Sequence, residues 1–285
     1  MAEQHEYVLT ATCNTASGIV AAVSQYLATQ GCYIAETHQF DDIEGGRLFM
    51  RVRFLSDQET GIDELQRGFE TIATPYDMNW QIRSASRKVR TIIMVSKFDH
   101  CLEDLLYRLR KGELNMDVMA VVSNHQDLRS RCESEGFPYL YLPVTPDNKN
   151  EQENKLWQLW LNTGAELIVL ARYMQVLTDD FCSRLPGQII NIHHSFLPGF
   201  KGAKPYHQAH ERGVKLIGAT AHYVTSDLDE GPIISQAVQE VDHTFTPKML
   251  VATGRDTETR ALARAVQLHC EQRVFLDGMK TVVFK

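Results

Sequence analysis

The sequence lacks the features that mark several classes of protein. No apolar run approaches the roughly 18 residues that a membrane-spanning helix requires, so no membrane partner is expected. The opening residues, Met-Ala-Glu-Gln-His-Glu, have neither the basic segment nor the apolar core of a secretion signal. The six cysteines are scattered and include no Cys-x-x-Cys pair. For a chain of 285 residues these absences predict a cytoplasmic protein with reduced thiols.

Lysine is missing from the first third of the chain. Residues 1–85 contain five arginines, no lysine and twelve acidic residues, for a net charge of −7, whereas residues 86–285 carry 24 basic and 24 acidic residues. This asymmetry predicts two domains, at 1–85 and 86–285. Neither part has the basic excess of a nucleic-acid-binding surface, so no nucleic-acid partner is expected.

The first part of the chain has the pattern of a small α/β domain. Residues 7–13 alternate like a half-buried strand, and apolar residues from Ile19 to Leu27 then recur at helical spacing. The patterns that follow predict strands at 33–40 and 48–54, a helix at 61–74 and a strand at 79–84. The order β-α-β-β-α-β is that of the ferredoxin-like unit.

This first part also resembles a known regulatory module. Cys13, the run Ser-Gly-Ile-Val-Ala-Ala-Val at 17–23, and Gly-Arg-Leu-Phe-Met-Arg at 46–51 are similar to an ACT domain, which often binds amino acids at a dimer interface. The family usually has a Pro-Asp-Lys/Arg-type sequence where this chain has Asn-Thr-Ala-Ser at 14–17. Binding of an amino-acid effector and a purely structural or dimerising role therefore both stay open. Because ACT-like modules commonly pair, we expect a homo-oligomer.

From residue 91 the pattern becomes one of alternating strands and helices. Short runs rich in Val and Ile predict strands at 91–96, 117–123, 139–142, 166–170 and 188–192. Amphipathic stretches predict helices at 100–110, 126–135, 150–163 and 178–184. Two further strands at 219–225 and 232–241 and a closing helix at 257–275 complete the expected elements. Such alternation predicts an α/β domain with a mostly parallel, Rossmann-like sheet covered by helices on both faces.

Two separated motifs place polar groups at the ends of apolar runs. The first is Asn-Ile-His-His-Ser-Phe-Leu-Pro at 191–198, and the second is Leu-Asp-Glu-Gly-Pro-Ile at 228–233. An amide can polarise a carbonyl oxygen, an imidazole can stabilise an oxyanion or move a proton, and a carboxylate can activate a nucleophile. Asn191, His193 and Asp229 would therefore form a site for acyl chemistry, because ligands bind beyond the carboxyl ends of parallel strands.

The two motifs together strongly resemble the catalytic core of enzymes that use 10-formyltetrahydrofolate. These include glycinamide ribonucleotide formyltransferase, methionyl-tRNA formyltransferase and formyltetrahydrofolate deformylase. The resemblance covers residues 90–285 and implies that Asn191, His193 and Asp229 are the catalytic residues. It also implies a folate pocket formed by the segment 171–177 and the run 224–229. The expected folate contacts are Met174, Gln175, Val176, Leu177, Val224 and Leu228. Folate is the substrate here, and no other cofactor is expected.

Each catalytic candidate also has an ordinary structural interpretation. Asn191 could end a strand, His193 could be a core histidine, and Asp229 could be a turn former. Their joint occurrence in the order of the family favours catalysis. In that interpretation Asn191 and His193 donate to the oxyanion of a tetrahedral intermediate, and Asp229 orients the attacking water. Whether His193 also carries a proton stays open.

Three features indicate water as the acceptor of the formyl group. The turn at 97–102 has no glycine and contains Asp99, whereas the glycinamide ribonucleotide enzyme cradles a phosphate there with a turn rich in glycine and serine. His194 stands where the transferases usually have proline. An ACT-like module before a formyltransferase-like domain is the deformylase arrangement, and no RNA-binding extension is expected after the closing helix.

The sequence therefore predicts hydrolysis of 10-formyltetrahydrofolate to tetrahydrofolate and formate, which would balance the one-carbon pool and supply formate for purine synthesis. A formyltransferase with an amine acceptor and a catalytically silent folate or amino-acid sensor remain alternatives. Residues 204–206 are expected to narrow the acceptor side of the site. His207 and His210 are spaced like metal ligands on a helix but lack partners at ligand spacing, so no metal site is expected.

Overall fold

The chain divides into two compact units. The computed structural model describes residues 5–56, 61–197 and 205–285. Unit 1 comprises Met1–Arg87, Glu271–Phe275 and Val282–Lys285, and unit 2 comprises Lys88–Cys270 and Leu276–Thr281. The division predicted from charge lies near residue 85 and places the whole of 86–285 in one domain. It did not include the two short C-terminal segments that belong to unit 1.

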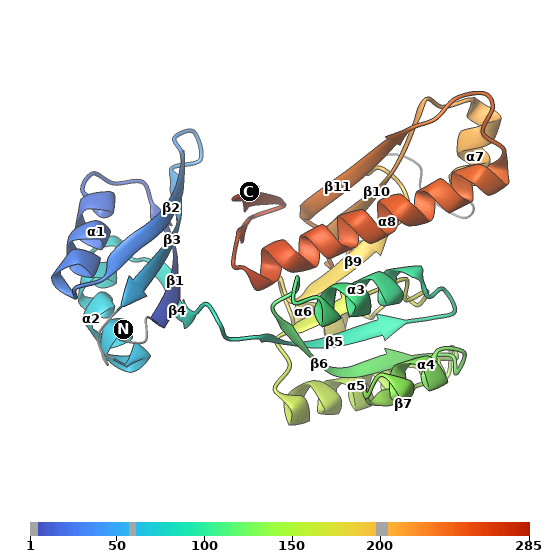
Figure 1. Ribbon diagram of the computed structural model, residues 1–285, viewed down its shortest axis with the longest axis horizontal. Helices are drawn as coiled ribbons and strands as arrows, with labels where there is room; N and C mark the ends of the chain where they lie inside the picture. Colours follow the sequence, from blue (N-terminus) through green and yellow to red (C-terminus); the bar gives the residue numbers. More distant parts are fainter. Residues whose placement is uncertain (1–4, 57–60, 198–204) are drawn as a thin grey trace. The chain divides into compact units, whose positions relative to one another are not determined.

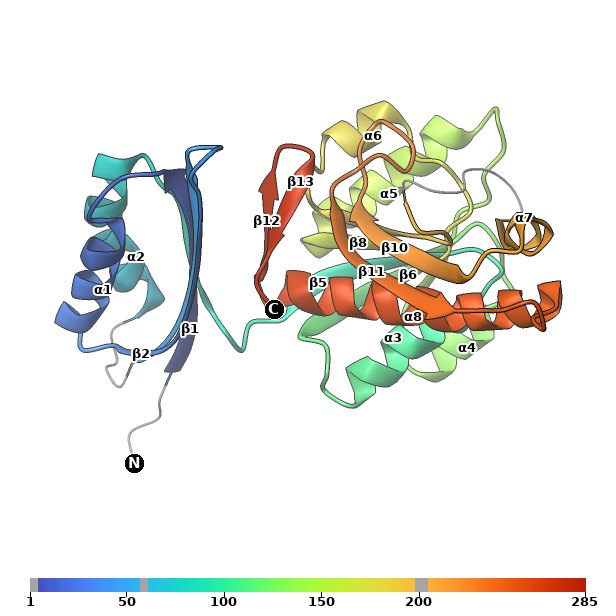
Figure 2. The ribbon, with the colours of Figure 1, turned by 90° about the horizontal axis from the view of Figure 1, so that it is seen from above.

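Unit 1 is built on a four-stranded antiparallel sheet with the order β2-β3-β1-β4. Its elements are β1 (His5–Asn14), α1 (Ile19–Thr29), β2 (Tyr33–Asp42), β3 (Arg47–Ser56), α2 (Ile62–Ala73), the 3-10 helix η1 (Thr74–Tyr76) and β4 (Asn79–Ser84). Helices α1 and α2 lie on one face of the sheet (Figure 2). The predicted ferredoxin-like β-α-β-β-α-β order is confirmed.

Both faces of the sheet in unit 1 are packed with aromatic side chains. On the helical side, Phe54 and Phe69 belong to the buried core. A second cluster contains Phe49 together with Phe275 and Phe284 from the C-terminal segments. The rings of Phe49 and Phe275 pack edge-to-face, with centroids 6.0 Å apart, which is a favoured aromatic geometry. The end of the chain thus covers apolar surface of unit 1.

The prediction of a closing helix at 257–275 is wrong at both ends. Helix α8 runs over Pro247–Cys270, and a hairpin of β12 (Val274–Asp277) and β13 (Lys280–Val283) follows it. The helix stops because Gln272 adopts a left-handed backbone conformation with φ of 57°. The hairpin turns at Gly278 and Met279, where Gly278 has φ of 58°.

Unit 2 contains a seven-stranded sheet with the order β11-β10-β9-β8-β5-β6-β7. Its strands are β5 (Val89–Val95), β6 (Met116–Ser123), β7 (Tyr139–Tyr141), β8 (Leu167–Leu170), β9 (Ile189–His193), β10 (Leu216–Tyr223) and β11 (Ile233–Glu240). Its helices are α3 (His100–Arg110), α4 (Arg129–Ser134), α5 (Lys149–Thr163), α6 (Asp179–Ser183), α7 (Pro205–Arg212) and α8. Strands β5 to β9 pair in parallel, and β10 pairs antiparallel with β9 and β11.

Helices cover both faces of this sheet. Helices α3 and α8 lie on one face and α5 and α6 on the other (Figures 1 and 2). All four residues of β8 are buried, as expected for a parallel strand covered on both sides. The predicted mostly parallel, doubly covered sheet is confirmed. In the described residues, no helix combines the length and apolarity needed to cross a membrane.

Candidate active site

A cavity of about 270 Å³ opens in unit 2 beside the carboxyl ends of β8 and β9. The segment after β8, the end of β9 and the turn between β10 and β11 form its walls. All nine residues predicted for the site line this cavity, namely Met174, Gln175, Val176, Leu177, Asn191, His193, Val224, Leu228 and Asp229. The position agrees with the rule that ligands bind beyond the carboxyl ends of parallel strands.

Asn191 is held in place by a histidine on the neighbouring strand. The register pairs Asn191 of β9 with His222 of β10, and Asn191 Nδ2 lies 3.3 Å from His222 Nε2. The other ring nitrogen of His222, Nδ1, lies 2.9 Å from the carbonyl oxygen of Tyr223. Because a carbonyl only accepts, Nδ1 carries the proton and Nε2 accepts from the amide. This chain of hydrogen bonds fixes which end of the Asn191 amide carries the donor.

His193 and Asp229 form a second pair in the lining of the cavity. The Nδ1 atom of His193 lies 3.0 Å from Oδ2 of Asp229. The opposite ring nitrogen, Nε2, is buried and has no hydrogen-bond partner among the described residues. A buried polar atom without a partner is costly, and on a residue that lines a cavity it is a candidate for bonding to a ligand.

Asp229 is presented by a tight turn. Its backbone is left-handed, with φ of 58°, a conformation that Asp and Asn adopt more readily than other residues with a side chain. Two residues later, a Cβ atom on Gly231 would lie 1.8 Å from the carbonyl oxygen of Tyr223. The turn therefore packs against the end of β10 so closely that only glycine fits, and this contact aims the Asp229 carboxylate at His193.

The Asp229 carboxylate is ionised in this environment. Burial alone would raise its pKa, but the contacts with His193 and His222 outweigh burial and hold the pKa well below its usual range. Its second oxygen, Oδ1, lies 3.6 Å from Nε2 of His222. A carboxylate facing Nδ1 of His193 can orient that ring and stabilise positive charge that develops on it.

The segment expected to bind folate forms an apolar wall of the cavity. Its backbone is anchored at Met174, whose N–H donates to Ser96 Oγ over 2.9 Å, and Ser96 in turn donates to Asn124. Leu177 is buried, whereas Met174 and Val176 are more than half exposed. Leu228 on the opposite wall is also exposed. Exposed apolar side chains around a cavity suit a flat aromatic ligand such as a pterin.

Comparisons with known proteins agree with this geometry. Residues 89–266 match the family model described as formyl transferase. Over its full length the chain is 54% identical to formyltetrahydrofolate deformylase of Corynebacterium sp. (strain P-1), and the alignment spans 100% of both chains.

The chain belongs to the formyltetrahydrofolate deformylase family.

The solved structures support the same grouping. The crystal structure of formyltetrahydrofolate deformylase from Burkholderia mallei is 52% identical and superposes with a TM-score of 0.95, covering 99% of this chain and 100% of that one. Glycinamide ribonucleotide transformylase 1 from Symbiobacterium toebii is 28% identical with a TM-score of 0.65, and covers only 71% of this chain. The likeness to the deformylase family thus extends over the whole chain, which the likeness to that transformylase does not.

Two further side chains line the cavity in this deformylase-family chain. His194 follows His193, with the two ring centroids 4.9 Å apart. Burial, reinforced by the neighbouring Arg172 and His193 side chains, lowers the pKa of His194 to about 4, so its ring is neutral at neutral pH. Arg172 has a left-handed backbone with φ of 65°.

Of the residues expected to narrow the acceptor side, Lys204 lies outside the described residues, and Tyr206 contacts the His194 ring with centroids 6.4 Å apart.

Sequence reasoning missed two polar members of the site. His222 was not selected, although a single histidine in the otherwise apolar end of β10 was a visible signal. Its contact with Asn191 depends on strand register, which the sequence alone does not specify. Arg172 lies inside the segment 171–177 assigned to folate, but its ion partner Glu258 is on α8, far along the chain.

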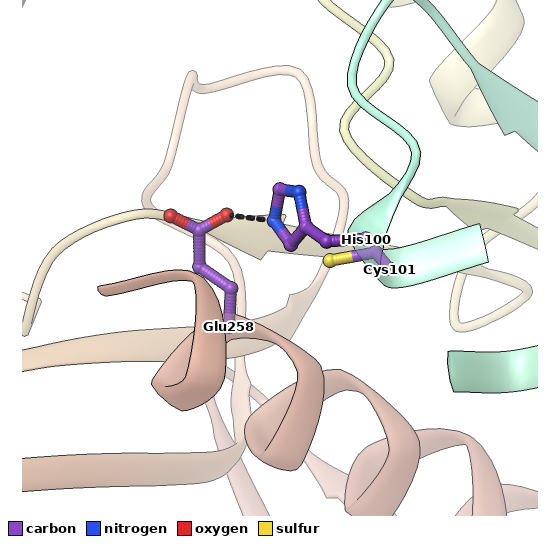
Figure 3. Close-up of side chains that lie close together, drawn as sticks. All are labelled: His100, Cys101 and Glu258. Carbon is purple, nitrogen blue, oxygen red and sulfur yellow. Dashed lines mark hydrogen bonds and ion pairs between the residues drawn. The ribbon is translucent and has the colours of Figure 1, made fainter. Parts of the chain in front are cut away.

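One group of side chains has the composition of a metal site. Among the described residues, His100, Cys101 and Glu258 bring potential ligand atoms within 4.8 Å of one another (Figure 3). Burial and the nearby Glu258 carboxylate raise the pKa of the Cys101 thiol well above its usual value, whereas a metal requires the thiolate. The group is better described as a buried ion-pair cluster. His207 and His210 belong to no such group in the part of the chain that the structure describes.

Proposed function

We propose that the chain hydrolyses 10-formyltetrahydrofolate to tetrahydrofolate and formate. The observation that carries this proposal is the His193 ring, which lines the cavity with a buried Nε2 atom that has no partner among the described residues, while Nδ1 faces the Asp229 carboxylate. This arrangement matches the Asp–His part of a hydrolytic triad, in which a carboxylate fixes the imidazole tautomer and the far nitrogen moves the proton. Membership of the deformylase family supports the same reaction.

In the first step, His193 Nε2 takes a proton from water as the water oxygen attacks the formyl carbon. The carbonyl oxygen becomes an oxyanion, and the Asn191 amide is placed to donate to it. One such donor typically contributes about 100- to 1000-fold in rate. The imidazolium that forms on His193 is stabilised by the ionised Asp229 carboxylate. In the second step, the bond between the formyl carbon and the folate nitrogen N10 breaks, and His193 returns the proton to that nitrogen.

This mechanism changes the role expected for Asp229. The sequence suggested that the carboxylate orients the attacking water directly. With Oδ2 only 3.0 Å from His193 Nδ1, we propose instead that Asp229 acts mainly through the imidazole. His193 then serves as the proton carrier, and Asn191 remains the donor to the oxyanion.

The folate would lie between the two apolar walls of the cavity. We propose that Met174, Gln175, Val176 and Leu177 contact the pterin on one side, and that Val224 and Leu228 contact it on the other. The backbone of the first wall is rigid at Met174 because its N–H is bonded to Ser96. No cofactor other than the folate substrate is needed for the steps above.

The proposal is tested by following loss of 10-formyltetrahydrofolate by absorbance, with and without glycinamide as an amine acceptor. Formate release at the same rate in both samples supports hydrolysis. Loss that depends on glycinamide would identify a formyltransferase instead. Absence of turnover, with folate still bound, would identify a silent sensor. The intact set of Asn191, His193 and Asp229 argues against that last outcome.

We also propose a wider role and an assembly for the chain. A cytoplasmic hydrolase of this kind would balance the one-carbon pool and supply formate for purine synthesis.

Strand β2 is an edge of the sheet in unit 1 and exposes Tyr33 and Phe40, which supports pairing into a homo-oligomer through this strand. A monomeric mass by light scattering at micromolar concentration would contradict the pairing.

An amino-acid effector is the remaining proposal for unit 1. The loop after β1 is a candidate site, but Thr15 is already engaged there: its hydroxyl donates to Asp41 over 2.6 Å and its N–H to the carbonyl of Gly46 over 2.9 Å. A scan of the common amino acids for changes in melting temperature and turnover tests the proposal. If none has an effect, unit 1 is left with a structural or dimerising role.

A further inference from the structure

A buried carboxylate that pairs with a residue of the cavity lining gathers three partners from different parts of unit 2. Glu258 on α8 is only 1% exposed. Its Oε2 lies 2.7 Å from His100 Nε2 and 3.3 Å from Arg172 Nε, and its Oε1 accepts from Tyr206 Oη over 2.8 Å. Figure 3 shows His100 reaching from the start of α3 toward the Glu258 side chain. A buried carboxylate is stable only when such partners compensate its loss of hydration, so these contacts fix the position of each side chain in the cluster.

The Tyr206 partner is brought in by a close helix packing. The ring of Tyr206 on α7 lies so near α8 that a Cβ atom on Gly254 would fall 2.1 Å from it. Gly254 stands one turn before Glu258 on the same helix, and its missing side chain lets the Tyr206 hydroxyl reach the carboxylate. The same tyrosine ring contacts His194, which lines the cavity. The cluster is thus in contact with the cavity wall at His194 as well as at Arg172.

Arg172 is an unusual residue for its backbone conformation. Its φ of 65° lies in the left-handed region that glycine adopts without strain. The guanidinium is nevertheless kept in place: it pairs with Glu258 and lies 5.3 Å from the centroid of the Phe98 ring. Among the described residues that line the cavity, Arg172 is the only arginine or lysine. A strained backbone that carries a long, anchored cation indicates a function for that side chain.

Arg172 and His194 are two lining residues that have no role in folate binding or in the catalytic steps proposed above. In the binding mode proposed above, residues 174–177 contact the folate on one side and Val224 and Leu228 on the other. His193, Asp229 and Asn191, which His222 holds in place, act on the formyl carbon. The cationic and imidazole side chains that remain in the lining are Arg172 and His194. The nucleophile must approach the formyl carbon from a side that the folate does not occupy, and Arg172 and His194 are the lining side chains of this kind left to border that side.

We infer that Arg172, anchored by Glu258, fills the acceptor side of the cavity and thereby selects water over an amine. The inference rests on the proposed hydrolysis and extends it to the basis of acceptor choice. Water is small enough to reach the carbon beside the guanidinium. An amine acceptor needs the volume that Arg172 occupies, and in its ammonium form it is also repelled by the guanidinium charge. Glu258, Tyr206 and His100 are positioning residues, because they act on the acceptor through Arg172 and His194.

The two competing reactions differ only in the nucleophile. With water, a carbon–oxygen bond forms, the carbon–N10 bond breaks, N10 receives a proton, and formate leaves. With an amine, a carbon–nitrogen bond forms, the same carbon–N10 bond breaks, and N10 receives the proton that the amine loses. Neither reaction needs an oxidant, a reductant or another reactant. The same His193 and Asn191 serve both, so the acceptor side alone decides the product.

The test is Arg172→Gly in the full-length protein, supplied with 10-formyltetrahydrofolate and glycinamide. Glycine suits the left-handed backbone, so the substitution opens the acceptor side without adding strain. The ratio of N-formylglycinamide to formate is measured by mass spectrometry and is expected to rise by about 10- to 100-fold over wild type, as for other single pocket changes. The KM for 10-formyltetrahydrofolate is expected to stay within about threefold, because the folate walls are unchanged.

Three further variants separate the role of the Arg172 side chain from that of its backbone and of its anchor. Arg172→Lys keeps a long cation and is expected to retain the wild-type product ratio. Asp77→Gly relieves a left-handed residue, with φ of 48°, on unit 1, and is expected to leave both products unchanged. Glu258→Gln keeps the size of the anchor but removes its charge, and is expected to raise the ratio less than Arg172→Gly does.

The outcomes distinguish this inference from the proposed function. If wild type releases no formate from 10-formyltetrahydrofolate, the proposed hydrolysis itself is wrong. If wild type releases formate but Arg172→Gly and Glu258→Gln both keep its product ratio, the hydrolysis stands and the inference about Arg172 is overturned. If Arg172→Gly does not fold, the ratio measured for Glu258→Gln decides alone.

Discussion

The Nδ1 atom of His193 lies 3.0 Å from Oδ2 of Asp229, and the two residues come from different elements, the end of β9 and the turn that follows β10. The far nitrogen of the same ring is buried without a partner among the described residues. This relationship gives each group a separate task. The carboxylate fixes and stabilises the ring, and the free nitrogen moves the proton.

The first prediction concerns the carboxylate. Asp229→Asn should lower kcat by about 10,000-fold, as for other carboxylates that orient a catalytic histidine, and leave the affinity for tetrahydrofolate nearly unchanged. Asparagine tolerates the left-handed backbone at this position, so the turn should keep its shape. Steady-state kinetics and fluorescence titration measure the two effects. The matched control is Asp227→Asn on the same turn, which should retain wild-type kcat. Wild-type turnover in Asp229→Asn would contradict the mechanism in which Asp229 orients and stabilises His193.

The second prediction concerns the oxyanion donor. Asn191→Ala removes the amide and should lower kcat by about 100- to 1000-fold, with a much smaller change in KM, because the amide acts mainly when negative charge develops on the formyl oxygen. Single-turnover kinetics with saturating enzyme isolate the chemical step. A KM raised by about the same factor, with kcat unchanged, would instead assign Asn191 to ground-state binding of the substrate.

The third prediction concerns the turn that carries Asp229. Gly231→Ala forces a Cβ atom to within 1.8 Å of the Tyr223 carbonyl, so the backbone must move. We expect a loss of about 1–3 kcal/mol in unfolding free energy together with a fall in kcat. Gly61→Ala, where a Cβ atom would meet nothing within 4 Å, is the control and should change neither quantity appreciably. Urea denaturation and a turnover assay on both variants provide the comparison.

The fourth prediction follows from the neutral state of His194. Its pKa is 6.5 in the unfolded chain and about 4 in the folded one, so between these values the unfolded chain holds the extra proton. Stability must therefore fall as the pH is lowered from 6.5 toward 4, and be unaffected by this group above 6.5. From pH 7 to pH 5 the contribution is about 2 kcal/mol.

His194→Asn tests this sign. The variant should lose about 2 kcal/mol less unfolding free energy than wild type when the pH is lowered from 7 to 5. His207→Asn, at an exposed position on α7, should behave like wild type. Urea denaturation of the three proteins at both pH values measures the difference. Parallel loss of stability in all three would show that His194 does not hold a lowered pKa.

Much of the fold followed from local patterns. The βαββαβ order of unit 1 and the alternation of strands and helices in unit 2 were predictable. Each element has a characteristic spacing of apolar residues and is bounded by glycine or polar residues that form turns. The C-terminal hairpin was not predicted, since the apolar spacing of α8 was extended through residue 275. Gly278, which begins the two-residue turn at 278–279, was a turn signal that this extended helix prediction did not take into account.

The candidate site likewise contains residues that local sequence motifs predict and residues that they do not. Asn191, His193 and Asp229 could be proposed because two compact motifs carry them in a fixed order. His222 and Arg172 could not, because their importance arises from contacts that only the folded chain brings about. His222 meets Asn191 through strand register, and Arg172 meets Glu258 across 86 positions of sequence. Local pattern does not encode either contact.

The most direct test of the central claim is turnover of 10-formyltetrahydrofolate in water enriched in heavy oxygen, without any amine. If His193 directs water to the formyl carbon, each formate released carries one oxygen from the solvent, and Asp229→Asn releases almost none in the same time. Formate without solvent oxygen, or no formate until an amine is added, would contradict the account.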